Sequence, residues 1–187
     1  KDRVHLEMLR AFLKSTHAIT WQDRTTTSFG GPFVYYSVRS ARIVEMLASR
    51  GMVRKRTRAP NAELASSVHF WRGAIDGDGC VGVSQSYAQV RLAGQRPLLE
   101  SFQKFLISNR LADLNICLAG ERTGSVLEIQ TMGKKALDII QALYAKASHS
   151  AVLARKYHRA QQLLNGRTEQ FPAYGSEGPC CTPVERA

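Results

Sequence analysis

The strongest structural signal in the sequence is the stretch Phe70-Trp-Arg-Gly-Ala-Ile-Asp-Gly-Asp-Gly79, which starts as a helix and closes on two acids. Asp76 and Asp78 are separated by one glycine. Carbonyl groups at a helix C-terminus carry partial negative charge, so each acid there costs up to about 1 kcal/mol unless a cation compensates it. We therefore expect a divalent metal ion at this end of the helix.

Small residues form a second pattern in the same stretch. Gly73 and Gly77 stand four residues apart, hence on one helical face, and Ser66 is expected to extend that face. Small residues let the backbone of another helix approach closely. The stretch contains Arg72 and Asp76 and is too short to span a bilayer. We therefore predict a helix interface at Gly73, Gly77 and Ser66 in a soluble protein.

Residues 71–79 resemble the signature of the LAGLIDADG homing endonucleases. The Gly, Ile, Asp, Asp and Gly positions match in order, and Arg72 stands where the signature has alanine. An aromatic-x-Arg-Gly lead is similar to the variant in intein-type and bacterial members. The resemblance implies an α+β fold, a saddle of two pseudo-symmetric αββαββ halves with paired motif helices.

The resemblance also implies a metal site. The last acid of each motif binds the catalytic metal in that family, which assigns Asp78 as a ligand, the Gly77 carbonyl as a weaker one, and Asp76 to shaping the helix end. We expect Mg²⁺, because carboxylate and carbonyl oxygens are hard ligands. A calcium loop starting at Asp76 is excluded, since Val81 and Tyr87 replace its glycine and glutamate. The remaining alternative is a polar turn that ends a buried helix.

The chain contains an internal repeat, in which residues 3–13 align with residues 96–106 as amphipathic helices. Two strand-like runs and a further helix follow each copy. These runs are 18–21, 33–38 and 41–50 in the first copy, and 114–119, 126–130 and 134–147 in the second.

Only the second copy is preceded by the motif helix and a hairpin, predicted at 80–85 and 89–93. We therefore expect a partial N-terminal half at 1–59, a full half at 60–166 and a flexible tail at 167–187. The first motif is missing, as in a truncated product, a processed fragment or a partial chain. Since the family's active site takes one acid from each motif, this chain alone is expected to supply half a site.

Two lysines are further candidates by resemblance. Lys156 lies in a segment similar to the one that carries the family's central basic residue, close to the scissile phosphate. A lysine there neutralises developing charge or orders the attacking water. Lys55 resembles its counterpart in the first half. The alternative for both is plain neutralisation of phosphates.

The charge balance indicates a nucleic-acid partner. The net charge of +11 exceeds what solubility requires. No signal peptide or membrane span is present, and the cysteines show neither zinc spacing nor a disulfide framework. We expect a cytoplasmic protein, or an organellar one if an organelle intron encodes it. Two basic clusters, which a solvated helix face would also explain, are Arg54, Lys55, Arg56 and Arg58, and Arg155, Lys156, His158 and Arg159.

The resemblance assigns the reading of double-stranded DNA to polar residues of the strands. Asn, Gln and Arg side chains can read base edges by paired hydrogen bonds. The candidates are Ser84, Gln85, Ser86, Gln89, Arg91, Glu128 and Gln130 in the second half, and Thr20, Gln22, Arg24, residues 25–27, Tyr36 and Arg39 in the first.

The sequence thus favours a site-specific homing endonuclease that hydrolyses phosphodiester bonds of duplex DNA with Mg²⁺. When complete, such a protein is a monomer with pseudo-two-fold symmetry, and a homodimer joined through Gly73 and Gly77 is the other arrangement. One alternative is a DNA- or RNA-binding relative that has lost cleavage, such as a maturase, a transcription factor or an inactive fragment. Another is a basic module with a coincidental motif.

Overall fold

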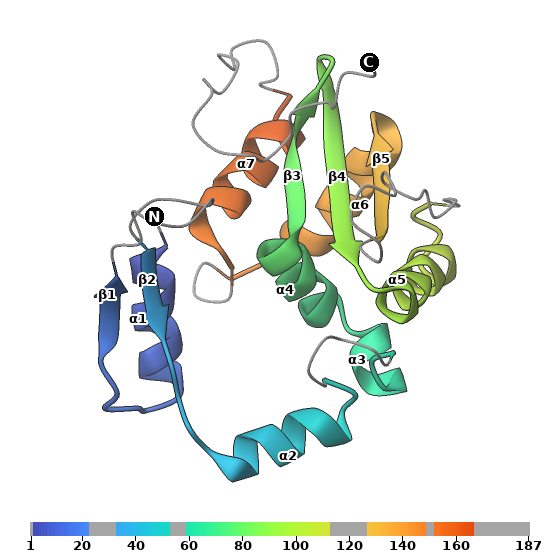
Figure 1. The fold of residues 1–187 in the computed structure, drawn as a ribbon. Coiled ribbons are helices and arrows are strands. Elements are labelled where there is room, and N and C mark those ends of the chain that lie inside the picture. Colours follow the sequence, from blue (N-terminus) through green and yellow to red (C-terminus); the bar gives the residue numbers. More distant parts are fainter. Residues whose placement is uncertain (1, 23–32, 53–58, 113–126, 149–151, 167–187) are drawn as a thin grey trace, which may run out of the picture.

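The computed structural model describes residues 2–22, 33–52, 59–112, 127–148 and 152–166, which form a mixed α+β structure (Figure 1). The expected α+β class is confirmed. The helices are α1 Arg3–Phe12, α2 Ala41–Ser49, α3 Ala62–Ser66, α4 Val68–Asp78, α5 Arg96–Ser108, α6 Lys134–Tyr144 and α7 Ala154–Leu164. The strands are β1 Ile19–Gln22, β2 Phe33–Tyr36, β3 Gly79–Ser84, β4 Tyr87–Gly94 and β5 Leu127–Met132.

The predicted motif helix is α4, and its first turn is fixed by Ser67. The Ser67 hydroxyl accepts a hydrogen bond from the Phe70 amide at 3.3 Å, while the extended backbone of Ser67 separates α4 from α3. Ser66 therefore belongs to α3. The prediction that Ser66 extends the Gly73 and Gly77 face is wrong, because the helix does not run through Ser67.

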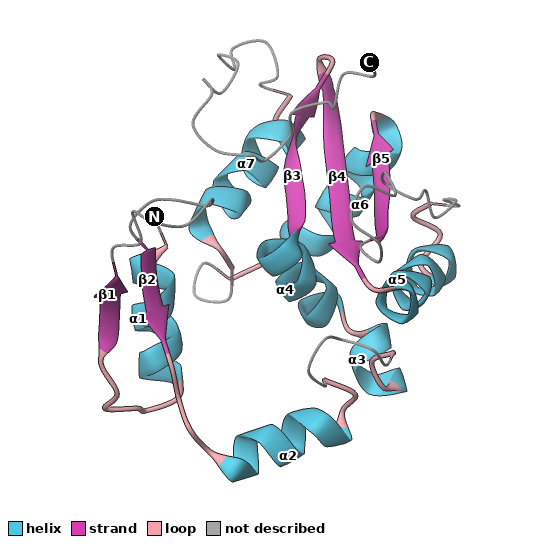
Figure 2. Ribbon diagram, viewed as in Figure 1, coloured by secondary structure: helices cyan, strands magenta, loops and turns pink. Residues whose placement is uncertain are grey.

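Strands β3, β4 and β5 form an antiparallel sheet in that order (Figure 2). Gln85 and Ser86 connect β3 to β4 with φ angles of 49° and 68°, the left-handed backbone that suits a tight hairpin. Strand β3 consequently ends at Ser84, one residue before the predicted end. Side chains alternate between the two faces, so Val81, Val90 and Ile129 join the core from one of them.

The core lies on the apolar face of this sheet, where α4, α5, α6 and α7 contribute buried side chains. Trp71 of α4 is fully buried; its ring centroid lies 5.0 Å from that of Phe102 and 5.8 Å from that of Phe105. Its indole nitrogen donates to the Ala65 carbonyl at 2.7 Å, which also fixes α3 against α4. Trp71 thus joins the motif helix to the rest of the half.

The described residues of the N-terminal part have the predicted order of elements but contribute no side chain to this core. Strands β1 and β2 follow α1 and precede α2 in the chain, and they pair antiparallel. This order matches the predicted first copy. Neither helix buries a side chain, and Phe12 and Val44 are 81% and 64% exposed. The core residues all lie between Trp71 and Leu163.

The second copy is seen in part. Helix α5, strand β5 and helix α6 occupy the predicted places, whereas the predicted strand at 114–119 lies outside the described residues. In the described ranges, no helix combines the length and apolar character needed to cross a membrane.

Candidate functional site

The candidate site is the C-terminal end of α4, where the helix passes directly into β3. Gly77 and Asp78 are exposed there. A Cβ atom at Gly79 would lie 2.6 Å from the Arg91 carbonyl oxygen and 2.8 Å from the Ile75 Cα. Only glycine fits this close approach of the helix end to the neighbouring strand. Gly79 therefore fixes Asp78 at the junction of helix and sheet.

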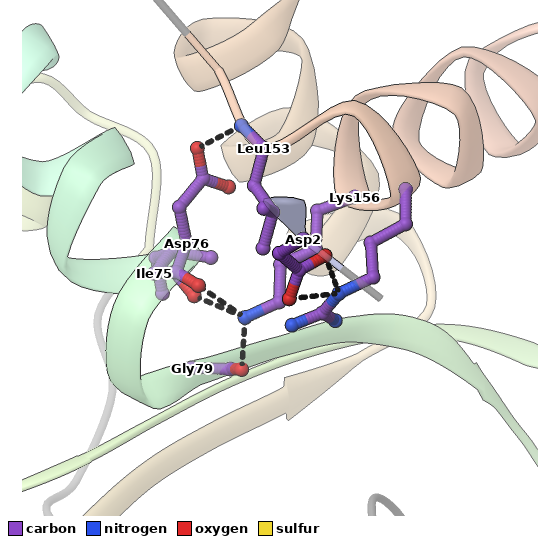
Figure 3. A network of polar contacts seen from close by, with 7 residues as sticks. Asp2, Ile75, Asp76, Gly79, Leu153 and Lys156 are labelled. Carbon is purple, nitrogen blue, oxygen red and sulfur yellow. Dashed lines mark hydrogen bonds and ion pairs between the residues drawn. The ribbon is translucent and has the colours of Figure 1, made fainter. Parts of the chain in front are cut away.

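Lys156 of α7 reaches the same C-terminal end of α4 (Figure 3). Its Nζ donates hydrogen bonds to the carbonyl oxygens of Ile75 at 2.7 Å, Asp76 at 2.9 Å and Gly79 at 2.6 Å. The side chain is 5% exposed. The structure thus brings Lys156 beside the motif, where its ammonium group contacts the backbone of α4.

This contact corrects one step of the sequence argument. We expected a divalent metal to compensate the negative end of α4, and the ammonium group of Lys156 occupies that position instead. A metal at Asp78 is therefore not needed for the stability of the helix end. A metal ion is still expected because the Asp78 carboxylate is exposed and because the motif resembles a metal-binding one.

Asp76 makes contacts within the protein with both carboxylate oxygens. One accepts from the Tyr144 hydroxyl at 2.6 Å, and the other from the Leu153 amide at 2.9 Å, at the start of α7. A carboxylate at a helix N-terminus is electrostatically favourable. Burial, with a smaller contribution from the charge of Asp76, raises the pKa of Tyr144, which therefore stays a hydrogen-bond donor. These contacts agree with the expectation that Asp76 shapes the helix end.

The donors that the resemblance assigns to a metal are the Asp78 carboxylate and the Gly77 carbonyl. Among the described residues, no group of three or more His, Cys, Asp or Glu side chains is arranged to hold an ion. Mg²⁺ is commonly held by one or two carboxylates together with waters and phosphate oxygens. An exposed carboxylate beside a carbonyl fits that mode of binding as half of a site.

Arg72, which departs from the family signature, is 3% exposed and has a structural contact that sequence reasoning missed. It donates to the Leu143 carbonyl at 3.1 Å and to the Nδ1 atom of His69 at 2.8 Å. Since a guanidinium group only donates, this His69 nitrogen acts as the acceptor. The contact at Leu143 places a cation near the C-terminal end of α6, which favours packing of α4 on α6.

The second basic cluster divides between two faces of α7. Arg155 and His158 are exposed, and Arg155 contacts Asp2 at 3.2 Å, whereas Lys156 faces inward with Ala160 and Leu163. The spacing of Lys156, Ala160 and Leu163 is that of one buried helical face, and this was the signal that could have found the inward lysine. The first cluster, with Lys55, lies outside the described residues.

The polar face of the larger sheet brings together five of the predicted DNA-reading residues. In the strand register, Ser84, Gln89, Arg91, Glu128 and Gln130 all lie on the side opposite the core. Arg91 Nε lies 3.5 Å from a Glu128 carboxylate oxygen. Gln89 is only 5% exposed, so the prediction that it presents its amide to DNA is wrong in this structure.

The remaining DNA-reading candidates have separate places. Gln85 and Ser86 are exposed at the hairpin tip. Gln22 shares one face of the small hairpin with Thr20, while Tyr36 lies on the other with Ile19. The register therefore places Gln22 and Tyr36 on opposite faces of this hairpin. The last two candidates are Arg39, exposed before α2, and Arg24, which with residues 25–27 lies outside the described part of the chain.

Among the described residues, no side chain packs directly on Gly73 or Gly77 of α4. A Cβ atom added at either glycine would meet no atom within 4 Å. Beside Gly73 lies a mostly apolar pocket of about 280 Å³. The predicted helix interface at Gly73 and Gly77 therefore stays a prediction about another helix. The pocket is lined by Gly51, Met52, Pro60, His69, Phe70, Gly73, Ala74 and Leu98.

Neither the models of known protein families nor the curated proteins contain a match to this chain. The similarity to the LAGLIDADG signature therefore depends on the motif residues of α4 and on the repeat.

Proposed function

We propose that this chain is a site-specific endonuclease of the LAGLIDADG type, which binds double-stranded DNA. It would hydrolyse a phosphodiester bond of that DNA at a site to which Asp78 contributes its carboxylate. The supporting observation is the place of Asp78. It is an exposed carboxylate that ends the motif helix one residue before the edge strand of a sheet with a polar outer face.

The DNA would lie along that polar face, with β3, β4 and β5 as one side of a saddle. The described helices cover the opposite face, and Arg91, Glu128 and Gln130 of the outer face are partly exposed. Arg91 and Gln130 are opposite each other in the register and can donate to base edges in the major groove. The net charge of +11 provides attraction to phosphates that does not depend on sequence.

In the proposed reaction, Asp78 and the Gly77 carbonyl would hold Mg²⁺, which would supply Lewis acidity at the phosphodiester. Asp76 holds the end of α4 through Tyr144 and Leu153 and so orients the Asp78 carboxylate. Lys55 is proposed to act near the phosphate in the first half.

A complete site needs a second acid. The described residues contain one exposed motif acid, and the Gly73 and Gly77 face offers a place for the helix that would carry the other. We propose that this helix belongs either to a pseudo-symmetric first half or to a second copy of the chain.

A second candidate function is a DNA- or RNA-binding relative that does not cleave, for which the polar outer face and the net charge of +11 would suffice. This protein would use the same polar face without metal chemistry. Binding and cleavage therefore have to be measured separately.

Binding is tested by selection from a randomised duplex library, followed by affinity measurements over a range of salt concentrations. We expect one long preferred site, and a loss of discrimination at one position in Arg91→Ala, worth about 1–3 kcal/mol. Lys134→Ala is the matched control, because Lys134 is an exposed cation at the start of α6 and lies outside the proposed face. Equal binding to all duplexes, or identical behaviour of the two variants, would exclude sequence reading by this face.

A further inference from the structure

We propose that Lys156 is a positioning residue, which fixes the last turn of α4 and with it the place of Asp78, and which makes no contact with a DNA phosphate. This inference rests on the proposed function for the role of Asp78. It assigns to Lys156 a different part from the phosphate contact that the family resemblance implies.

The number of N–H donors limits what the Lys156 ammonium group can contact. An ammonium group has three N–H donors, and the three contacts of Lys156 with carbonyl oxygens are all between 2.6 and 2.9 Å. A phosphate could be contacted only by giving up one of these bonds. That exchange would leave a carbonyl oxygen at the end of α4 without its charged donor, in a place where Lys156 is 5% exposed.

The positions of the three carbonyl oxygens that Lys156 contacts also indicate a positioning role. Those of Ile75 and Asp76 belong to the last turn of α4, and that of Gly79 belongs to the first residue of β3. Gly77 and Asp78 lie between them in the chain. A single cation thus fixes the backbone on both sides of the two proposed metal donors.

Helix α7 is attached to α4 at a second point. The Leu153 amide at the start of α7 donates to Asp76, three residues before Lys156. Lys156 and Asp76 therefore form reciprocal contacts, a cation at the C-terminus of α4 and an anion at the N-terminus of α7. Such an arrangement fixes the backbone turn at the end of α4. The Asp78 side chain of this turn is exposed.

The wild-type protein allows a test that does not depend on any variant. With ¹⁵N-labelled lysine, the Lys156 ammonium group should give a slowly exchanging signal that keeps its chemical shift when the selected duplex is added. A change in that signal on DNA binding, or on replacing phosphate oxygens of the duplex by sulfur, would overturn the proposal. Failure to bind any duplex would refute the proposed function instead, and the slow exchange in the free protein would still report the contact with α4.

Two variants extend the test. Lys156→Met should raise the hydrogen-exchange rates of the amides at 77–80 roughly 10- to 100-fold, as expected for loss of charged hydrogen bonds. Its DNA affinity should keep the wild-type dependence on salt. A lost phosphate contact would instead lower the slope of log K against log[salt] by about 0.9.

Lys156→Arg retains the charge but cannot place one compact ammonium group on three carbonyl oxygens. We expect it to show faster exchange at 77–80 than the wild type, with an unchanged salt slope. Restoration of cleavage by arginine without restoration of slow exchange would overturn the proposal, since a charge alone would then suffice.

Discussion

Two carboxylates separated by a single glycine have different surroundings at the end of α4, and this difference divides a structural acid from the proposed functional one. Asp76 contacts Tyr144 and the Leu153 amide, whereas Asp78 is exposed. The sequence predicted this division through the motif. It could not predict that Lys156 compensates the helix end, because a lysine in a basic segment normally indicates a solvated surface.

Asp76→Asn should destabilise the protein, because the amide group cannot accept from both donors and would direct an N–H group toward one of them. Hydrogen bonds to charged groups contribute roughly 1.5–3 kcal/mol, so we expect a loss of that order in the free energy of unfolding. Urea denaturation measures it, with Asp78→Asn as the matched control. Equal stability of the two variants would contradict the assigned roles.

Tyr144 gives the stability a dependence on alkaline pH. Its pKa is raised in the folded state, so its contribution is complete below the ordinary value of 10.0 and is lost as the pH rises above it. The unfolded chain then releases a proton that the folded chain retains. Between pH 10 and 11 the wild type should lose up to about 1.4 kcal/mol per pH unit more than Tyr144→Phe. Parallel stability curves from denaturant titrations would show that Tyr144 is not coupled to folding.

At the scale of the elements, hydrophobic periodicity and turn residues predicted most helices and strands correctly to within a few residues. Both copies of the repeat helix, the hairpin after the motif and α2 are examples. The break between α3 and α4 was missed, although Ser67 is a typical N-cap residue, because the apolar pattern continues across it. The faces of the small hairpin, which separate Tyr36 from Gln22, could not be assigned from the sequence, since polar character alone does not determine the register.

Gly79 tests how the end of α4 meets the sheet. Gly79→Ala places a Cβ atom against backbone atoms of Ile75 and Arg91, which cannot move as a side chain can. We expect a loss of about 1–3 kcal/mol in stability, typical of overpacking, measured by thermal or urea unfolding.

Gly82→Ala on the same strand is the matched control, because its Cβ would lie 3.7 Å from the Cys80 sulfur, an ordinary contact. Similar unfolding midpoints for the Gly79 and Gly82 variants would contradict the described junction.

At the scale of the whole molecule, the two halves differ in what they bury. The repeat predicted similar elements in both, and the structure has them except for the strand at 114–119, which lies outside the described residues; the described core residues all belong to the second half. Which apolar side chains remain exposed followed only from the structure, because burial depends on packing between distant segments.

This arrangement predicts that a fragment of residues 60–166 folds without residues 1–59. All core residues lie within it, and the contacts across the boundary include the exposed ion pair between Arg155 and Asp2, worth at most about 1 kcal/mol. Circular dichroism and urea unfolding of the fragment should show a cooperative transition within about 2 kcal/mol of the full chain. An unfolded fragment would mean that the N-terminal part is required for the core.

The most direct test of the proposed function is cleavage of the selected duplex by the purified chain in Mg²⁺, beside Asp78→Asn and Asp138→Asn. Asp138 is a matched acid on α6 that pairs with Lys134. We predict Mg²⁺-dependent cutting at one site by the wild type and by Asp138→Asn, and none by Asp78→Asn, with unchanged duplex affinity in all three. Binding without cutting by the wild type, or cutting that survives Asp78→Asn, would contradict the proposal that Asp78 forms an endonuclease site.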